Sequence, residues 1–321
     1  MTSTSLPDSP DSPEELRERW MLSADLAAAE TPLERSQASL SAAQRILARE
    51  CVPLLTALLI AADPPRPVST CSSRLVTYTD VATGLLDDAA SELEAAHELE
   101  ARPEADVLWQ TRDRVAMLRA FAGMFAALGK ADGSSASQEA LLDACNELAL
   151  YQHDDNRGIA ESVRFWRAVA YRHANRPERA LQLLHPILAA PAPRRLGYWA
   201  RLERCRSLCD ADRHAAGIAL CLRIEARVPT WFDGVSEETC KKAADTAKFI
   251  HIELLQSWES ALRDAGQDDR AEHAATEAVK LRGSDSYPPT PDRWLGLEES
   301  IAGLPDDAPD AVDPAPDSDA D

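Results

Sequence analysis

Residues 168–184 read AVAYRHANRPERALQLL and carry the clearest structural signal in the chain. The small and apolar residues 168–171 lead to a break at Asn175-Arg176-Pro177, and a second run with Ala180 and Leu184 follows that break. Proline suits the first turn of a helix, where its missing N–H would have no partner in any case. The stretch therefore predicts the end of one helix, a tight turn and the start of a second helix.

Similar stripes and breaks extend from this stretch in both directions. The chain of 321 residues has only 12 glycines, and its prevalent alanine, leucine, glutamate and arginine favour helices. Thr31-Pro32 predicts a helix start at about residue 32, and Pro53 should kink or restart that helix. The spacing of apolar residues over 237–265 predicts one helix of about eight turns, which Gly266 turns into a last arm. We expect an all-α fold.

The stretch at 168–184 resembles a tetratricopeptide repeat. In that family a small residue precedes an aromatic one by three positions, and an alanine and a large apolar residue follow in the second helix. Ala168, Tyr171, Ala180 and Leu184 occupy these places. Small residues let the two antiparallel helices approach closely. The resemblance implies antiparallel helical hairpins stacked as an α-solenoid, with two weaker copies at Cys205, Leu208, Gly217, Cys221 and at Leu262, Gly266, Ala271, Ala275.

Composition divides the chain into four regions. Residues 1–11 are rich in serine, threonine, aspartate and proline, and 305–321 hold seven aspartates, four prolines and no basic residue. Such segments have too little apolar surface to form a core. We predict a disordered N-terminus over 1–11, an N-terminal helical region over 12–152, a tetratricopeptide-like region of hairpins over 153–303, and a disordered acidic tail over 304–321.

The charge and the cysteines exclude several classes of protein. A net charge of −20 without a basic cluster argues against nucleic-acid binding, which needs lysine and arginine patches. The longest apolar run, 52–62, is too short to span a bilayer. Seven scattered cysteines do not form a secreted disulfide pattern, so we expect buried thiols. We predict a cytoplasmic protein that binds neither nucleic acid nor membrane.

The resemblance also implies a function, which is to hold a partner protein or peptide in a groove. The first helix of each hairpin lines that groove in the tetratricopeptide family. Arg172, Arg206 and Arg263 fall on it, and three guanidinium groups could clamp a peptide carboxylate. The family positions that line the groove fall on Phe165, Val169, Arg172 and His173, on Leu202, Arg206 and Asp210, and on Gln256, Ser260 and Arg263.

Other chemistry has weaker support. Cys205, Cys209, His214 and Cys221 could form a zinc site, but Cys205 and Cys221 also fall at packing positions. No nucleotide-binding glycine loop and no nucleophile motif occurs, and we predict no cofactor.

Two alternatives to the scaffold stay open. The pair His153-Asp154, with His97, resembles the signature of metal-dependent HD-type phosphohydrolases. Self-association of an accessory helical domain, driven by 52–62, is the second alternative. We favour a non-enzymatic scaffold.

Overall fold

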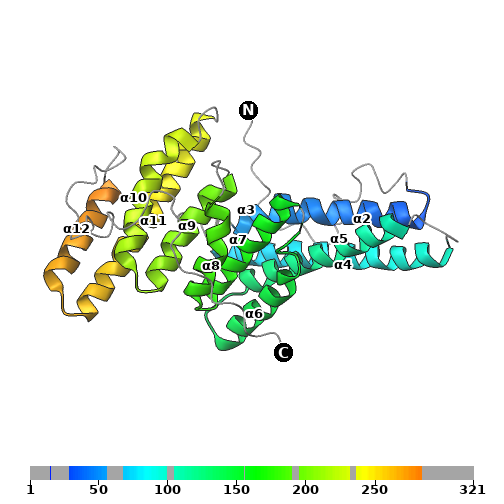
Figure 1. The fold of residues 1–321 in the computed structure, drawn as a ribbon, viewed down its shortest axis with the longest axis horizontal. Coiled ribbons are helices and arrows are strands. Elements are labelled where there is room, and N and C mark those ends of the chain that lie inside the picture. The colour runs from blue at the N-terminus through cyan, green and yellow to red at the C-terminus, as the bar shows by residue number, and fades with distance from the viewer. Residues whose placement is uncertain are drawn as a thin grey trace. The chain divides into compact units, whose positions relative to one another are not determined.

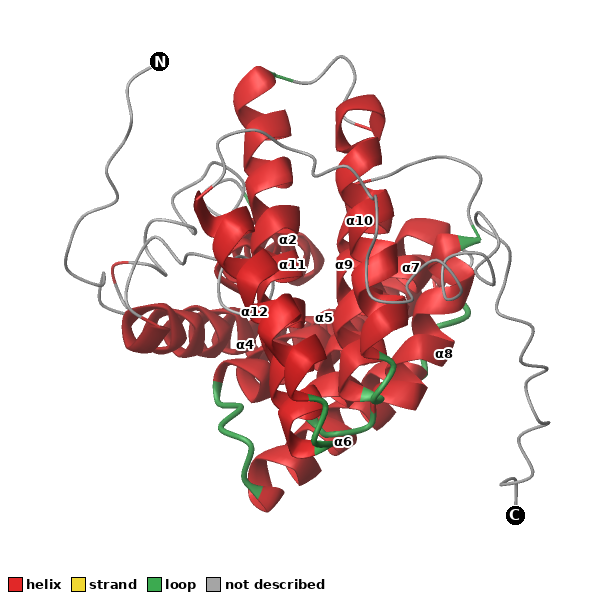
Figure 2. Cartoon of the chain, turned by 90° about the vertical axis from the view of Figure 1, so that its left-hand side faces the viewer, coloured by secondary structure: helices red, strands yellow, loops and turns green. Residues whose placement is uncertain are grey.

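The computed structural model describes residue 15 and residues 29–55, 68–99, 105–154, 156–189, 195–231 and 236–283. Every regular element in these ranges is a helix, as predicted, and Figure 2 shows no strand among them. The predicted disordered ends and most of the apolar run 52–62 lie outside the described residues. Within the described ranges, no helix combines the length and apolarity needed to cross a bilayer.

The chain divides into two compact units, Met1–Asn175 and Arg176–Asp321. The division lies beyond the boundary that the sequence predicted between residues 152 and 153. It also falls inside the stretch 168–184, at Asn175, whose φ of 58° ends the preceding helix in the left-handed region. The helices on either side of this break belong to different units.

The first unit contains α2 (Pro32–Ile46), η1 (Leu47–Cys51), α3 (Val52–Leu55), α4 (Val68–Leu99), α5 (Ala105–Gly129), α6 (Ser135–Ala149) and α7 (Arg157–His173). Helix α4 packs against both α2 and α5, and α7 packs against both α5 and α6 (Figure 1). Trp166 of α7 makes edge contacts with Phe125 of α5 and with Phe165. These contacts explain why residues 156–175 belong to the first unit.

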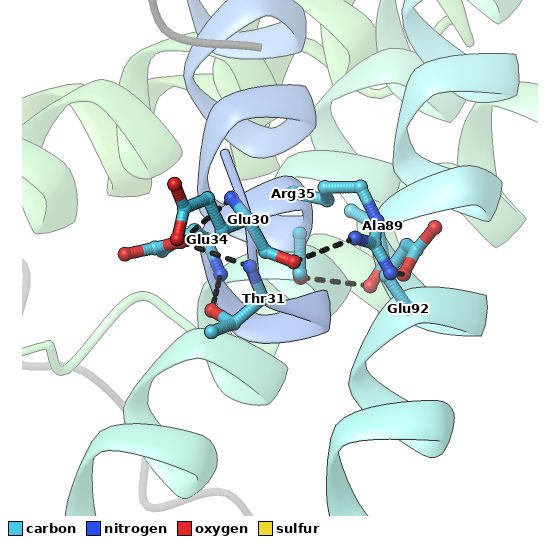
Figure 3. Close-up of polar contacts among 7 residues, drawn as sticks. Glu30, Thr31, Glu34, Arg35, Ala89 and Glu92 are labelled. Atoms are coloured by element: carbon cyan, nitrogen blue, oxygen red, sulfur yellow. Dashed lines mark hydrogen bonds and ion pairs between the residues drawn. The ribbon is translucent and has the colours of Figure 1, made fainter. Parts of the chain in front are cut away.

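Helix α2 begins at Pro32, as the sequence predicted. The Thr31 hydroxyl accepts the backbone N–H of Glu34, and the Glu34 carboxylate accepts the N–H of Thr31 (Figure 3). This capping box satisfies donors that a helix start leaves without partners. Ser36 then donates to the carbonyl of Ala89 on α4 at 2.8 Å, which ties the two helices together.

Pro53 changes the helix in a specific way. Helix α2 passes directly into the π-helical segment η1, where the N–H of Val52 bonds to the carbonyl of Leu47, and then into α3. Because proline cannot donate a backbone hydrogen bond, the helix widens before it and then resumes. The predicted disturbance at Pro53 therefore takes the form of a π-helical turn.

The second unit contains α8 (Pro177–Leu188), α9 (Arg195–Asp210), α10 (His214–Trp231), α11 (Glu237–Asp264) and α12 (Asp268–Gly283). Each helix packs against the next, and α9 also contacts α11. The predicted long helix is α11, and Gly266, with φ of 68°, turns the chain into α12. One apolar core extends from Tyr198 on α9 to Leu281 on α12.

A close approach of backbones joins α9 and α10. A Cβ atom on Gly217 would lie 2.7 Å from the carbonyl oxygen of Cys205 and 2.8 Å from Sγ of Cys209. Only glycine fits at this distance, because a methyl group needs more than 3 Å. Gly217 thus allows α9 and α10 to pack closely at this point.

Candidate functional site

Helices α9 and α11 run parallel and side by side. The Tyr198 hydroxyl donates to the carbonyl of Ala243 at 2.5 Å, and further along both helices Arg206 pairs with Glu253. Tyr198 precedes Arg206 in α9, and their partners Ala243 and Glu253 follow in the same order in α11, so the two helices point in the same direction. Helix α10 connects them and packs against each (Figure 1). The first helices of two successive hairpins are therefore neighbours.

Exposed polar side chains follow one line along α11. They recur at intervals of three and four residues, which places them on a single face of the helix. Two of them contact residues of neighbouring helices. Glu253 pairs with Arg206 of α9, and Ser257 contacts His214 of α10. We call this line the α11 stripe, and it consists of Glu253, Gln256, Ser257, Ser260 and Arg263.

Arg206 lies beneath the stripe and is already neutralised. Its side chain is 10% exposed, and its Nη2 lies 2.5 Å and its Nε 3.2 Å from the same Oε2 of Glu253. A charge-assisted pair of this kind fixes both side chains. Arg206 therefore holds α9 to α11, and it is not a free cation awaiting a carboxylate.

Arg263 is the one cation among the five residues of the stripe, and it is accessible. Its side chain is 60% exposed, and it pairs at 2.7 Å with Glu259, one turn earlier in α11. Exposed pairs at this spacing contribute only a few tenths of a kcal/mol. Arg263 can therefore exchange Glu259 for another acceptor at little cost.

His214 adds an imidazole at the start of α10. Its Nε2 lies 3.3 Å from Oγ of Ser257. Burial lowers the pKa of His214, while the nearby carboxylates of Asp212 and Asp210 act in the opposite direction. Asp210 itself is exposed at the end of α9. Ser257, in the middle of the stripe, thus lies beside an imidazole that has two carboxylates nearby.

Three predicted groove residues pack the interior. Phe165 and Val169 are buried in the first unit, and Leu202 is buried in the second. The prediction that these three side chains meet a partner is therefore wrong. In α7 six successive residues, 165–170, are buried, so the predicted groove face of this helix is covered by the protein itself.

The remaining predicted groove residues are divided between the two units. Arg172 and His173 are half-buried at the end of α7, where Nη2 of Arg172 lies 3.1 Å from Nε2 of His173. Asp210, Gln256, Ser260 and Arg263 are exposed in the second unit. The structure brings the α9 and α11 members together, and the α7 members belong to the other unit.

The cysteines lie at packing positions. Cys205, Cys209 and Cys221 are buried, and Sγ of Cys209 faces the backbone carbonyl of His214 instead of its ring. Burial raises the pKa of the Cys209 and Cys221 thiols far above the usual value. No group of three or more His, Cys, Asp or Glu residues in the described part of the chain could hold a metal ion.

The histidine-aspartate pair lies in a surface turn. His153 and Asp154 follow α6, His153 is exposed, and its ring contacts the Gln152 side chain at 2.9 Å. His97 is exposed near the end of α4. The described structure gives these three residues no shared ligand geometry.

Two elements of the site were missed in the sequence. Glu253 lies 47 residues from Arg206, and no local pattern links them. Ser257 carried a usable signal, because it lies three residues before Ser260, which the sequence placed on the groove face. Comparison with protein-family models, with curated proteins and with solved structures finds no match to this chain.

Proposed function

We propose that this chain is a scaffold that holds an extended segment of a partner protein along the face formed by α9 and the α11 stripe. The observation that supports this most directly is the parallel pairing of α9 and α11 beneath a continuous line of exposed polar side chains. In solenoids of helical hairpins, such neighbouring first helices form the binding surface. We infer that the hairpins are degenerate tetratricopeptide-type repeats.

The chemistry of the stripe suits a peptide. Gln256 offers donors and an acceptor to a peptide backbone, and the small Ser260 leaves room for close approach. Arg263 can receive a carboxylate from the partner in place of Glu259. The Arg206–Glu253 pair keeps α9 and α11 in fixed register, so the surface is preorganised and less entropy is lost on binding.

The absence of disulfide bonds among the described cysteines supports a proposal for the cellular compartment of this scaffold. The six described cysteines are all free, and five of them are buried. Unpaired thiols persist where glutathione keeps proteins reduced. We infer a cytoplasmic scaffold.

The proposal is tested by selecting peptides from a random display library on the full chain. The selected peptides are then titrated against Ser260→Trp, which places a large ring in the middle of the stripe. We expect affinity to fall by about tenfold or more, equivalent to about 1.4 kcal/mol. Gln256→Ala and Arg263→Ala should each weaken binding by a smaller factor.

Glu272→Trp provides the matched control, because Glu272 is exposed on α12 and lies outside the stripe. It adds the same ring to the same unit, so it should leave affinity unchanged. Peptides that bind the Ser260 and Glu272 variants equally well would show that the stripe is not the binding surface. Light scattering on the free chain distinguishes a scaffold from a domain that only self-associates.

A further inference from the structure

Arg167 is a buried cation in the first unit. The residue is 7% exposed in α7, its Nη1 donates to the side-chain carbonyl of Gln152, and its guanidinium carbon lies 5.9 Å from the centre of the Tyr171 ring. Its Nε is buried and has no hydrogen-bond partner. Among the residues that the structure describes, no carboxylate pairs with it.

This arrangement is costly for the protein by itself. A guanidinium removed from water loses hydration that a neutral amide and an aromatic ring replace only in part. Arg206 in the second unit is buried to a similar degree, yet it has the carboxylate of Glu253 within 2.5 Å. Arg167 thus lacks the counter-charge that the same chain supplies to a comparable arginine.

The surrounding helix is basic, although the chain is acidic. Helix α7 contains four arginines and one glutamate, in a chain with a net charge of −20. The glutamate, Glu161, is held by Arg157 at 2.6 Å. Arg164 and Tyr171 lie on the same side of the helix as Arg167, at intervals of three and four residues. Arg164 is half-buried and has no ion pair within the described ranges.

Gln152 is the neutral group in the place that an anion would take. It belongs to the turn after α6, it is half-buried, and its neighbour His153 is exposed. Its side-chain oxygen is uncharged and accepts a hydrogen bond from Nη1 of Arg167. A carboxylate oxygen in that place would form a charge-assisted hydrogen bond of roughly twice the strength.

We propose that Arg167, with Arg164 beside it and Gln152 as its exchangeable neutral partner, binds a carboxylate of an acidic peptide segment. The site lies in the first unit and is separate from the α11 stripe, so it does not depend on the function proposed for that stripe. Its ligand is an aspartate- or glutamate-rich segment of a partner protein.

The test measures binding of acetyl-Asp-Asp-Asp-Asp-amide to the full chain by calorimetry, with the tetra-asparagine peptide as the uncharged reference. Gln152→Glu places an internal carboxylate at Arg167. We expect this variant to melt at a higher temperature and to bind the acidic peptide about tenfold or more weakly. Asn146→Asp adds the same charge at an exposed position of α6, and it should leave affinity within about twofold of the wild type.

A second variant identifies the source of the carboxylate. Replacing the seven aspartates of 305–321 with asparagine keeps the chain length and removes the internal competitor. Unchanged peptide binding by this variant is the result expected for a partner's carboxylate. Tighter binding would overturn that assignment, because the chain's own acidic segment would then compete for Arg167.

Two results would overturn the site itself. The first is a lack of acidic-peptide binding by both the wild type and the asparagine variant. The second is binding that Gln152→Glu and Asn146→Asp weaken equally, because the peptide would then respond only to net charge.

Discussion

Nδ1 of His251 lies 3.0 Å from Oε1 of Glu225, and both side chains are fully buried between α10 and α11. Sγ of Cys221 contacts the same carboxylate oxygen at 3.8 Å and the carbonyl of Ala247 at 3.5 Å. The apolar core of the second unit thus contains a specific polar contact. A buried polar pair of this kind stabilises one packing arrangement only while both partners are present.

We predict strong coupling between Glu225 and His251. Replacing either one with leucine leaves the other buried without its partner, and each change should lower the free energy of unfolding by about 3 kcal/mol or more. The double replacement removes both polar groups and should cost much less than the sum of the single changes. Urea unfolding of the four proteins gives the coupling free energy, and additive losses would contradict the prediction.

Two glycines allow a matched test of helix packing. Gly217→Ala forces a methyl group against the carbonyl of Cys205 and should destabilise the protein by about 1–3 kcal/mol. Gly84→Ala in α4 meets no atom within 4 Å and should stabilise it by about 0.5–1 kcal/mol, because alanine loses less backbone entropy in a helix. Urea unfolding measures both, and equal effects would show that the contact at Gly217 is not tight.

The capping box of α2 gives a dependence on pH. Hydrogen bonds from the backbone N–H groups of Thr31 and Glu30, and from the Thr31 hydroxyl, lower the pKa of Glu34 below its usual 4.5. A lowered pKa means that the charged carboxylate stabilises the folded state above pH 4.5, and that this contribution disappears as the pH falls through the lowered pKa.

Thr31→Ala should therefore lower the free energy of unfolding by about 1 kcal/mol at pH 7, as expected for an N-cap. Glu34→Gln should be less stable than the wild type at pH 7, and the difference should shrink in acid. Thermal unfolding between pH 3 and 7 checks this result. A difference that grows on acidification would have the wrong sign for a lowered pKa.

The thiols should differ in reactivity. Burial raises the pKa of Cys145 to about 12 and raises that of Cys51 and Cys209 further, so these thiols are protonated and covered at neutral pH. Cys240 is the one half-buried thiol among the six described cysteines. Pulsed alkylation with peptide mass spectrometry should label Cys240 about tenfold faster than the others. Equal labelling would mean that the core opens readily.

Local signals in the sequence were sufficient to predict many helix boundaries. Thr31-Pro32 marks the start of α2, and the stripe over 237–265 marks α11 almost to the residue. These signals are reliable because capping and helical periodicity involve residues within one or two turns. Gly266 likewise ends α11 by a backbone conformation that glycine adopts at low cost.

The candidate site was only partly predictable. Gln256, Ser260 and Arg263 are exposed on α11, as a groove requires. Phe165, Val169 and Leu202 were predicted to face a partner and are buried instead. A repeat pattern predicts which face of a helix packs inward and which lines the groove, but it does not show how many neighbouring helices cover that helix.

By itself, the sequence determined that the described part of this chain is all-α and where several of its helices begin and end, because those features depend on neighbouring residues. Only the tertiary structure decided which side chains reach solvent and which charges have partners. Arg206 is neutralised by Glu253 from 47 residues away, whereas the nearest polar partner of Arg167 is the neutral Gln152. Packing of distant helices sets these pairings, and residue spacing along one helix cannot contain that information.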